Sequence, residues 1–129
     1  MPAIEKMHVY RVEHSKRKHG PFSKSRHDGT GIGLHVTQHR EYEKMPAPSK
    51  DGLHRFRSND RFAFPTIQAY VSFWNPSTLL DLQALGFVLC EYVVHPRHVL
   101  IGQSGWQLIY NCRASKKVAE LDLLEPFDM

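Results

Sequence analysis

The sequence has few cysteines and no long apolar run, and both absences limit what the chain can be. Its 129 residues include two cysteines, Cys90 and Cys112, which are too few for a disulfide framework. Because each lies in or beside an apolar stretch, we expect both to be buried free thiols in a reducing compartment. No stretch approaches the roughly 20 apolar residues that span a bilayer, and Met1–Tyr10 lacks the apolar core of a secretory signal. We therefore expect a cytoplasmic protein that has no membrane segment.

Basic residues are scarce in the second half of the chain, and most of the positive charge lies in the first half. Residues 1–61 hold 13 Lys and Arg against 7 Asp and Glu, a net charge of +6, whereas residues 62–129 hold 4 against 6, a net charge of −2. Seven of the nine histidines also precede residue 62. Such a basic segment favours an acidic partner, whether nucleic acid, a nucleotide or an acidic protein surface. The alternative is a solvated loop region whose charge keeps the chain soluble.

The length and the composition, with 41% apolar and 23% charged residues, predict one globular domain over residues 1–129. Alternating side chains predict a first strand at Met7–Glu13. Long basic loops rich in turn residues follow over residues 14–60. Within them the pattern allows a short strand at Ile32–Thr37 and a short helix at Gln38–Lys44.

Two capped helices and four strands are predicted in the remaining part, residues 61–129. Thr66 is suited to cap a helix with an apolar stripe, which Asn75-Pro76 ends. Ser77 is suited to cap a second helix through Leu85, with Gly86 in the left-handed conformation after it. Apolar runs predict strands at Phe87–Val94, Val99–Ile101, Trp106–Tyr110 and Val118–Leu124, the first of them central. Together, these helices and strands predict an α+β fold, in which two short helices pack on a mostly antiparallel sheet of about five strands.

Motifs for catalysis or metal binding are incomplete in this sequence. Gly29–Gly33 contains three alternating glycines but lacks the lysine of a phosphate-binding loop. His35-Val36-Thr37 is half of the paired motif of two-histidine phosphoesterases, and no hydroxyl residue follows His98 at the matching place. His35 and His39 have no third ligand at a suitable spacing. The sequence therefore predicts no catalytic residue, no metal and no cofactor.

Nucleic-acid binding stays an alternative because basic and aromatic side chains occur together before residue 62. Arginine and lysine can hold phosphates while phenylalanine stacks on bases. No recognition-helix, zinc-finger or RNA-binding-sheet signature accompanies them. The residues concerned are Arg17, Lys18, Phe22, Lys24, Arg26, Arg55, Phe56, Arg57 and Arg61.

Several short sequence motifs spread over the chain resemble those of small uncharacterised proteins of temperate phages and prophages. The resemblance implies an accessory gene product that acts in the bacterial cytoplasm, often on a host or defence protein, and it implies no specific reaction. The motifs are Tyr10-Arg11-Val12-Glu13, Gly20-Pro21-Phe22, Pro46-x-Pro48 with Asp51-Gly52, Phe62-Ala63-Phe64, Phe73-Trp74, Gly86-Phe87, and Gly102-Gln103 before Gln107 and Tyr110.

A fainter resemblance, to ADP-ribosyltransferase-like folds, supplies the enzyme alternative. It is carried by Arg11, Thr66 and the segment Gln103–Gln107, which follow the order of that fold's arginine, hydroxyl and acidic positions. This chain has glutamines where the fold has a carboxylate, and a neutral amide stabilises a developing cation less than a charge does. The resemblance thus implies a transferase, or a degenerate version of the fold that binds NAD or another nucleotide.

Taken together, the sequence favours a protein-binding module over an enzyme. We expect it to bind a host or anti-phage defence protein that has an acidic surface, with nucleic acid as the alternative partner and no role for a membrane. Aromatic and arginine side chains dominate the energetics of protein interfaces. The predicted binding residues are Tyr10, Arg11, Arg17, Phe22, Arg26, Tyr42, Arg55, Phe56 and Arg57.

Overall fold

The structure, a computed structural model, describes residues 5–16, 51–53 and 57–128. Within these ranges the chain forms two α-helices and six β-strands, which confirms the predicted α+β class. The helices are α1 (Ile67–Phe73) and α2 (Pro76–Ala84), and the strands are β1 (Met7–His14), β2 (Asp60–Ala63), β3 (Phe87–Val94), β4 (Val99–Ile101), β5 (Leu108–Asn111) and β6 (Ser115–Leu121). Short 3-10 helices η4 (Pro96–His98), η5 (Cys112–Ala114) and η6 (Glu125–Asp128) follow β3, β5 and β6.

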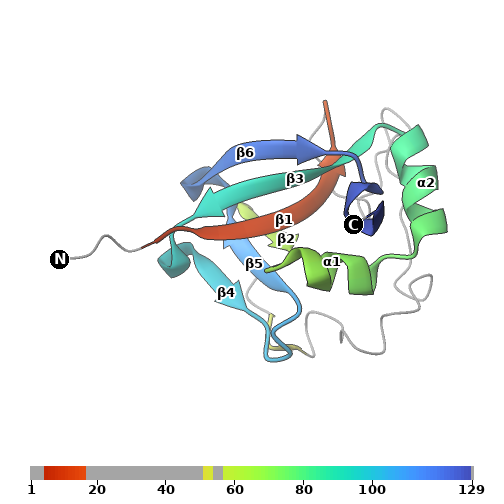
Figure 1. Ribbon diagram of the computed structural model, residues 1–129. Helices are drawn as coiled ribbons and strands as arrows, with labels where there is room; N and C mark the ends of the chain where they lie inside the picture. Colours follow the sequence, from red (N-terminus) through yellow and green to blue (C-terminus); the bar gives the residue numbers. More distant parts are fainter. Residues whose placement is uncertain (1–4, 17–50, 54–56, 129) are drawn as a thin grey trace.

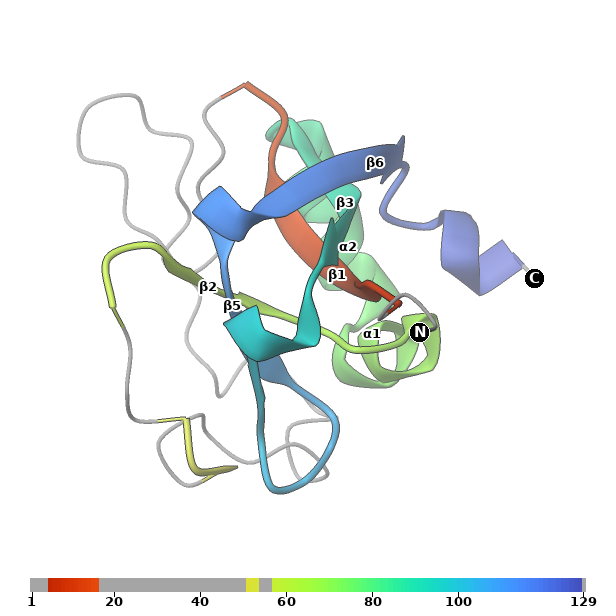
Figure 2. The same cartoon turned by 90° about the vertical axis from the view of Figure 1, so that its left-hand side faces the viewer.

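The strands form two antiparallel sheets of three strands each in the described ranges. Sheet A has the order β1-β3-β6, and sheet B has the order β2-β5-β4 (Figure 1). The apolar strand β3 lies at the centre of sheet A, as its continuous apolar run predicts. In Figure 2 the hairpin of β4 and β5 extends to the bottom of the view, away from β6.

Strand β1 joins the two sheets. On one side it pairs along its whole length with β3, from Met7 opposite Val94 to His14 opposite Phe87. On its other side Tyr10 makes an isolated bridge to Phe64, just after β2, with backbone hydrogen bonds of 2.9 and 2.7 Å. The core therefore includes residues that precede position 61, and it is not confined to the second half of the chain.

Sheet A is covered on both faces, because the two apolar clusters of the core lie on opposite sides of it. The larger cluster joins Val12, Phe87 and Leu89 of sheet A to the helices. The smaller joins Val9 and Val94 to the inner face of sheet B. The layers are thus helices, sheet A and sheet B. Besides the sheet A residues, the larger cluster contains Phe64, Ala69, Tyr70, Phe73, Trp74, Leu79, Leu82 and Leu123, and the smaller contains Ala63, Leu108 and Tyr110.

The helices begin at polar caps, one of which differs from the prediction. The hydroxyl oxygen of Thr66 accepts the Ala69 N–H at 3.0 Å and caps α1, as predicted. Helix α2 is capped by Asn75, whose Oδ1 accepts the Ser77 N–H at 3.0 Å, so the prediction of Ser77 as the cap is wrong. The physical reason is Pro76, which has no N–H to satisfy and suits the first helical position.

Strands β5 and β6 also differ from their predicted bounds. Strand β5 starts at Leu108, two residues later than predicted, because Trp106 still belongs to the turn and donates its N–H to the Ser104 hydroxyl at 3.2 Å. Strand β6 spans Ser115–Leu121, earlier than the predicted Val118–Leu124, since Ser115 already pairs with Val94. Backbone pairing to β3 outweighs the polar character of Lys116 and Lys117.

The strand predicted at Ile32–Thr37, the helix predicted at Gln38–Lys44 and most of the loops predicted over residues 14–60 lie outside the described residues. The described helices are all too short or too polar to cross a membrane.

Replacing Gly86 should destabilise the fold more than replacing Gly105. Both glycines have positive φ, +94° and +78°, so alanine at either costs about 1–2 kcal/mol. A Cβ at Gly86 would also lie 2.8 Å from Nε2 of the buried His14, whereas one at Gly105 meets open space. We expect Gly86→Ala to lose about 1–3 kcal/mol more than Gly105→Ala, the range for overpacking. Urea unfolding of the two variants measures this difference, and equal losses would contradict the packing of His14 on Gly86.

Candidate functional site

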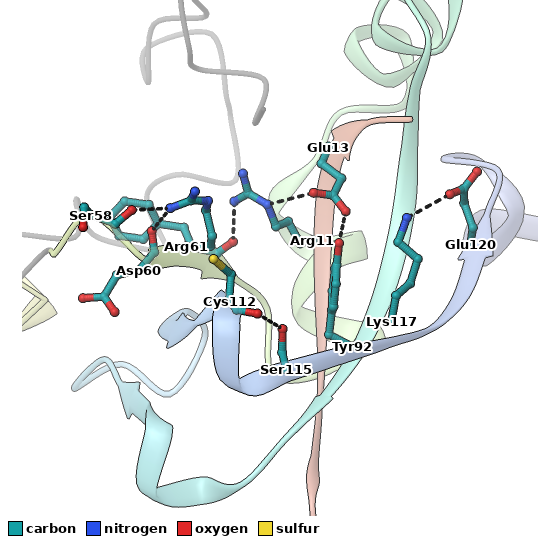
Figure 3. Close-up of polar contacts among 11 residues, drawn as sticks. Arg11, Glu13, Ser58, Asp60, Arg61, Tyr92, Cys112, Ser115, Lys117 and Glu120 are labelled. Atoms are coloured by element: carbon teal, nitrogen blue, oxygen red, sulfur yellow. Dashed lines mark hydrogen bonds and ion pairs between the residues drawn. The ribbon is translucent and has the colours of Figure 1, made fainter. Parts of the chain in front are cut away.

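A buried ion pair on β1 holds the two sheets together. Arg11 and Glu13 are 8% and 3% exposed, and Nε of Arg11 lies 3.6 Å from Oε2 of Glu13, an ion-pair distance too long for a hydrogen bond. The Arg11 guanidinium also donates from Nη1 to the carbonyl oxygen of Phe62 at 3.1 Å (Figure 3). Arg11 therefore ties β1 of sheet A to β2 of sheet B, and it helps to set the position of Phe62.

The Glu13 carboxylate also organises the neighbouring strand β3. The hydroxyl of Tyr92 donates to Oε1 of Glu13, as Figure 3 shows. Burial, with a hydrogen bond to Glu13, raises the pKa of the Cys90 thiol to about 12. Burial likewise raises the pKa of the Tyr92 phenol above its ordinary value. Tyr92 and Cys90 thus stay neutral near pH 7, and the charge in this cluster resides on Arg11 and Glu13.

Sheet B carries an apolar row on the face that points away from sheet A. Phe62 pairs with Ile109, and Ile109 pairs with Leu100, so the three side chains lie side by side across β2, β5 and β4. They alternate with Ala63, Leu108 and Tyr110, which belong to the cluster facing sheet A. Phe62 is 38% and Leu100 43% exposed, while Ile109 between them is 4% exposed. We call this set of three residues the apolar row.

Four arginines lie at one end of sheet B, and one of them, Arg61, is on the face toward sheet A because it pairs with Tyr110. The pairing of Asp60 with Asn111 and of Val99 with Tyr110 brings together the start of β2, the end of β5 and the start of β4. The residues at these three ends include four arginines and one aspartate, a net charge of +3. We call the four the arginine rim; they are Arg57, Arg61, Arg97 and Arg113.

Local hydrogen bonds fix part of this rim. Nη1 of Arg61 donates to the carbonyl oxygens of Ser58 and Asp60, both at 2.8 Å (Figure 3). The Asp60 carboxylate accepts the backbone N–H of Arg57 at 2.9 Å. Arg57, Arg97 and Arg113 have exposed side chains. The rim thus combines one ordered guanidinium with three that can reach a partner.

The other end of sheet B is held by a buried carboxylate. Asp51 is 2% exposed and accepts three hydrogen bonds, from the N–H and the hydroxyl of Ser104 at 2.7 and 2.8 Å and from the Gln107 amide at 3.0 Å. Gln103 donates its N–H to the Asp51 carbonyl at 2.9 Å. These bonds fix the turn between β4 and β5, so β4 is anchored at the end opposite the arginine rim.

Residues 7–124 match the family model described as Bacteriophage T4 Y00F protein. The chain belongs to this phage protein family. A search of the curated proteins gave no match, and a search of the solved structures gave none either. The expectation of a phage protein is therefore confirmed, while the short sequence motifs and the resemblance to ADP-ribosyltransferases stay hypotheses.

Few of the residues predicted to bind a partner fall in the part of this phage protein that the structure describes. Arg57 is exposed on the arginine rim. Tyr10 is half-buried against the larger core cluster, and burial with the nearby charge of Glu91 raises the pKa of its phenol. Arg11 is buried and paired, which removes it from the surface where we expected it. Arg17, Phe22, Arg26, Tyr42, Arg55 and Phe56 lie outside the described residues.

The positions of the transferase hypothesis serve structural contacts in the phage protein. Arg11 is paired with Glu13, Thr66 caps α1, and Gln107 donates to Asp51. Over the described ranges no group of three or more His, Cys, Asp or Glu side chains could hold a metal ion.

Sequence reasoning missed the apolar row because its members do not form a motif. Phe62 and Leu100 stand in separate strands of ordinary apolar composition, and only the pairing through Ile109 joins them. The sequence of β4 did contain a signal for an exposed apolar surface. In a strand with one face toward solvent, polar and apolar residues alternate, but all three residues of β4 are apolar.

Removing Arg11 should destabilise the protein strongly, and removing Glu13 as well should restore part of the loss. Arg11→Met leaves the Glu13 charge buried without its ion pair, and such changes cost about 3–5 kcal/mol. The double variant Arg11→Met with Glu13→Gln removes the stranded charge, so we expect it to be more stable than Arg11→Met alone. Denaturant unfolding of both single variants and the double variant measures the coupling. Strictly additive losses would show that the two side chains do not act as a pair.

The two thiols should differ in reactivity. Cys90 is buried and its pKa of about 12 keeps it protonated, whereas Cys112 is only half-buried, which corrects the prediction that both are buried. Because the thiolate is the reactive form, we expect iodoacetamide to modify Cys112 in the folded protein and Cys90 only after unfolding in urea. Mass spectrometry of the digested protein locates the label. Equal labelling of the two cysteines in the folded state would count against the burial of Cys90.

Proposed function

We propose that this member of the phage family is an accessory protein that binds a host or anti-phage defence protein in the bacterial cytoplasm. The observation that carries the proposal is the apolar row of Phe62, Ile109 and Leu100 beside the arginine rim. Phe62 and Leu100 flank the buried Ile109 and each stays about two-fifths exposed, and large exposed apolar side chains close together are typical of interaction sites.

The composition of this surface supports a protein partner. An apolar centre with arginines at its border is the usual anatomy of a protein interface, since aromatic and arginine residues are enriched there. The net charge of +3 over the four arginines and Asp60 favours a partner whose surface is acidic, and it also speeds encounter with such a partner.

Rigidity of the surface supports the proposal as well. The apolar row lies on paired strands, with Arg11 bonded to Phe62 behind it and Asp51 holding the adjoining turn. A site on rigid elements loses little conformational entropy on binding. Such a surface can therefore bind with a small ordering cost.

Capture from host lysate, followed by binding to the purified partner, tests this proposal. We expect Phe62→Ser with Leu100→Ser to weaken binding at least about tenfold, because the loss of two central apolar side chains exceeds 1.4 kcal/mol. Leu80→Ser is the matched control, since Leu80 is 54% exposed on α2, away from sheet B. Calorimetry with the purified partner measures each affinity.

Three results would contradict the proposal. Loss of binding with Leu80→Ser but not with the sheet B variant would move the site elsewhere. Captured material that disappears after nuclease treatment, with binding that falls steeply with salt, would favour the nucleic-acid alternative. Consumption of NAD, or transfer of its ADP-ribose to a target, would favour the enzyme alternative.

A further inference from the structure

We infer that the partner binds by adding an extended, acidic strand to the outer edge of β4, the edge that faces away from β5. This inference rests on the proposed function and specifies how the partner is recognised. Strand β4 lies at the border of sheet B (Figure 1), and within the described residues β5 is the one strand that pairs with it.

Backbone groups of β4 point toward this edge. The Gly102 N–H donates to the Gln107 carbonyl at 2.9 Å, toward β5. Because the backbone groups of successive strand residues point alternately to the two sides, those of Ile101 point away from β5, as does the carbonyl of Val99. The same alternation is seen at the Val99 N–H, which turns away from β5 and bonds to the Pro96 carbonyl. The Gln103 N–H, on the same side as that of Ile101, already bonds to the Asp51 carbonyl at 2.9 Å. An added strand can thus bond to the N–H and the carbonyl of Ile101 and to the carbonyl of Val99, and it must end before Gln103.

An added strand would bury side chains of β4 on both faces of sheet B. Leu100 ends the apolar row on the outer face, and Ile101 ends the row of Ala63 and Leu108 on the inner face. Leu100 is 43% and Ile101 47% exposed. Since directly opposite residues of neighbouring strands pack side chain on side chain, an added strand with apolar residues would extend both rows.

The contrast with the outer edge of sheet A strengthens the argument. Strand β6 also lacks a second partner strand among the residues described, but it carries Lys116 and Lys117 and its pairing is interrupted by a register shift opposite Glu91 and Tyr92. Lysines, bulges and very short edge strands are devices by which proteins prevent unwanted pairing at an edge. Strand β4 is short, with three residues, but it carries no lysine and no register shift, and its exposed side chains are apolar.

Charge selects an acidic strand over a second copy of this chain. Residues 95–105, which contain β4 and its flanks, include one arginine and two histidines but no Asp or Glu. Two copies joined at β4 in parallel would place two arginine rims side by side, and in either orientation each copy carries a net charge of +4. Like charges placed opposite one another oppose association, whereas glutamates or aspartates beside the apolar residues of the added strand would face Arg97 and Arg113.

A pair of variants at one residue tests strand addition. Ile101→Pro removes the outward N–H, and proline is tolerated on an edge strand where that N–H faces solvent. Ile101→Val keeps the N–H and a β-branched side chain, so it is the matched control. The probe is a fluorescent peptide that alternates glutamate with valine, with the alternating lysine and valine peptide as its counterpart.

Fluorescence anisotropy should show that the glutamate peptide binds at least about tenfold more tightly than the lysine peptide, and that Ile101→Pro loses about tenfold while Ile101→Val does not. In the unsubstituted protein, hydrogen exchange measured by NMR should slow at the Ile101 N–H when the glutamate peptide is added. This second measurement stands even if Ile101→Pro unfolds.

Absence of binding by the glutamate peptide, unchanged exchange at the Ile101 N–H in its presence, or equal binding of the two peptides would overturn the inference. A captured partner that keeps its affinity for Ile101→Pro but loses it for Phe62→Ser with Leu100→Ser would overturn strand addition and leave the proposed function standing. If that partner instead keeps its affinity for both variants, the apolar row is not the site and both proposals fail.

Discussion

The buried pair of Arg11 and Glu13 is the interaction on which the arrangement of the two sheets depends. Charges removed from water are costly unless other groups satisfy them. Here the Phe62 carbonyl accepts from Arg11, and Tyr92 donates to Glu13. Because these partners come from β2 and β3, satisfying the two charges also fixes sheet B against sheet A. The isolated bridge between Tyr10 and Phe64 adds two backbone hydrogen bonds at the same junction.

The order of the layers gives the two sheets different surroundings. Sheet A is covered by the helices on one face and by sheet B on the other, so its side chains supply stability. Sheet B has one face toward sheet A, and its other face carries Phe62 and Leu100 with much of their surface exposed. The exposed side chains of this row are the basis of the proposal that sheet B is the recognition surface, with sheet A and the helices as its scaffold.

Local signals predicted much of the fold. The cap at Thr66, the left-handed Gly86 and the apolar run of β3 depend on residues close in sequence, and the structure has them as expected. The start of β6 was missed because Lys116 and Lys117 gave no apolar signal, and pairing with β3 decided the strand instead. Arg11 was predicted to bind a partner because arginine side chains dominate the energetics of interfaces. Its carboxylate partner stands two residues later, but the burial of both comes from sheet B, which is distant in sequence.

By itself, then, the sequence determined the α+β class, the two helices with the Thr66 cap of the first, the central strand and the phage family, because short-range patterns and local backbone preferences carry that information. It also contained the scarcity of acidic residues around β4. Only the tertiary structure decided that Arg11 is buried and that Phe62, Ile109 and Leu100 form one row. Those outcomes depend on which strands pair and on which face meets sheet A, and they need contacts between distant parts of the sequence, such as Arg11 with Phe62 and Phe62 with Ile109.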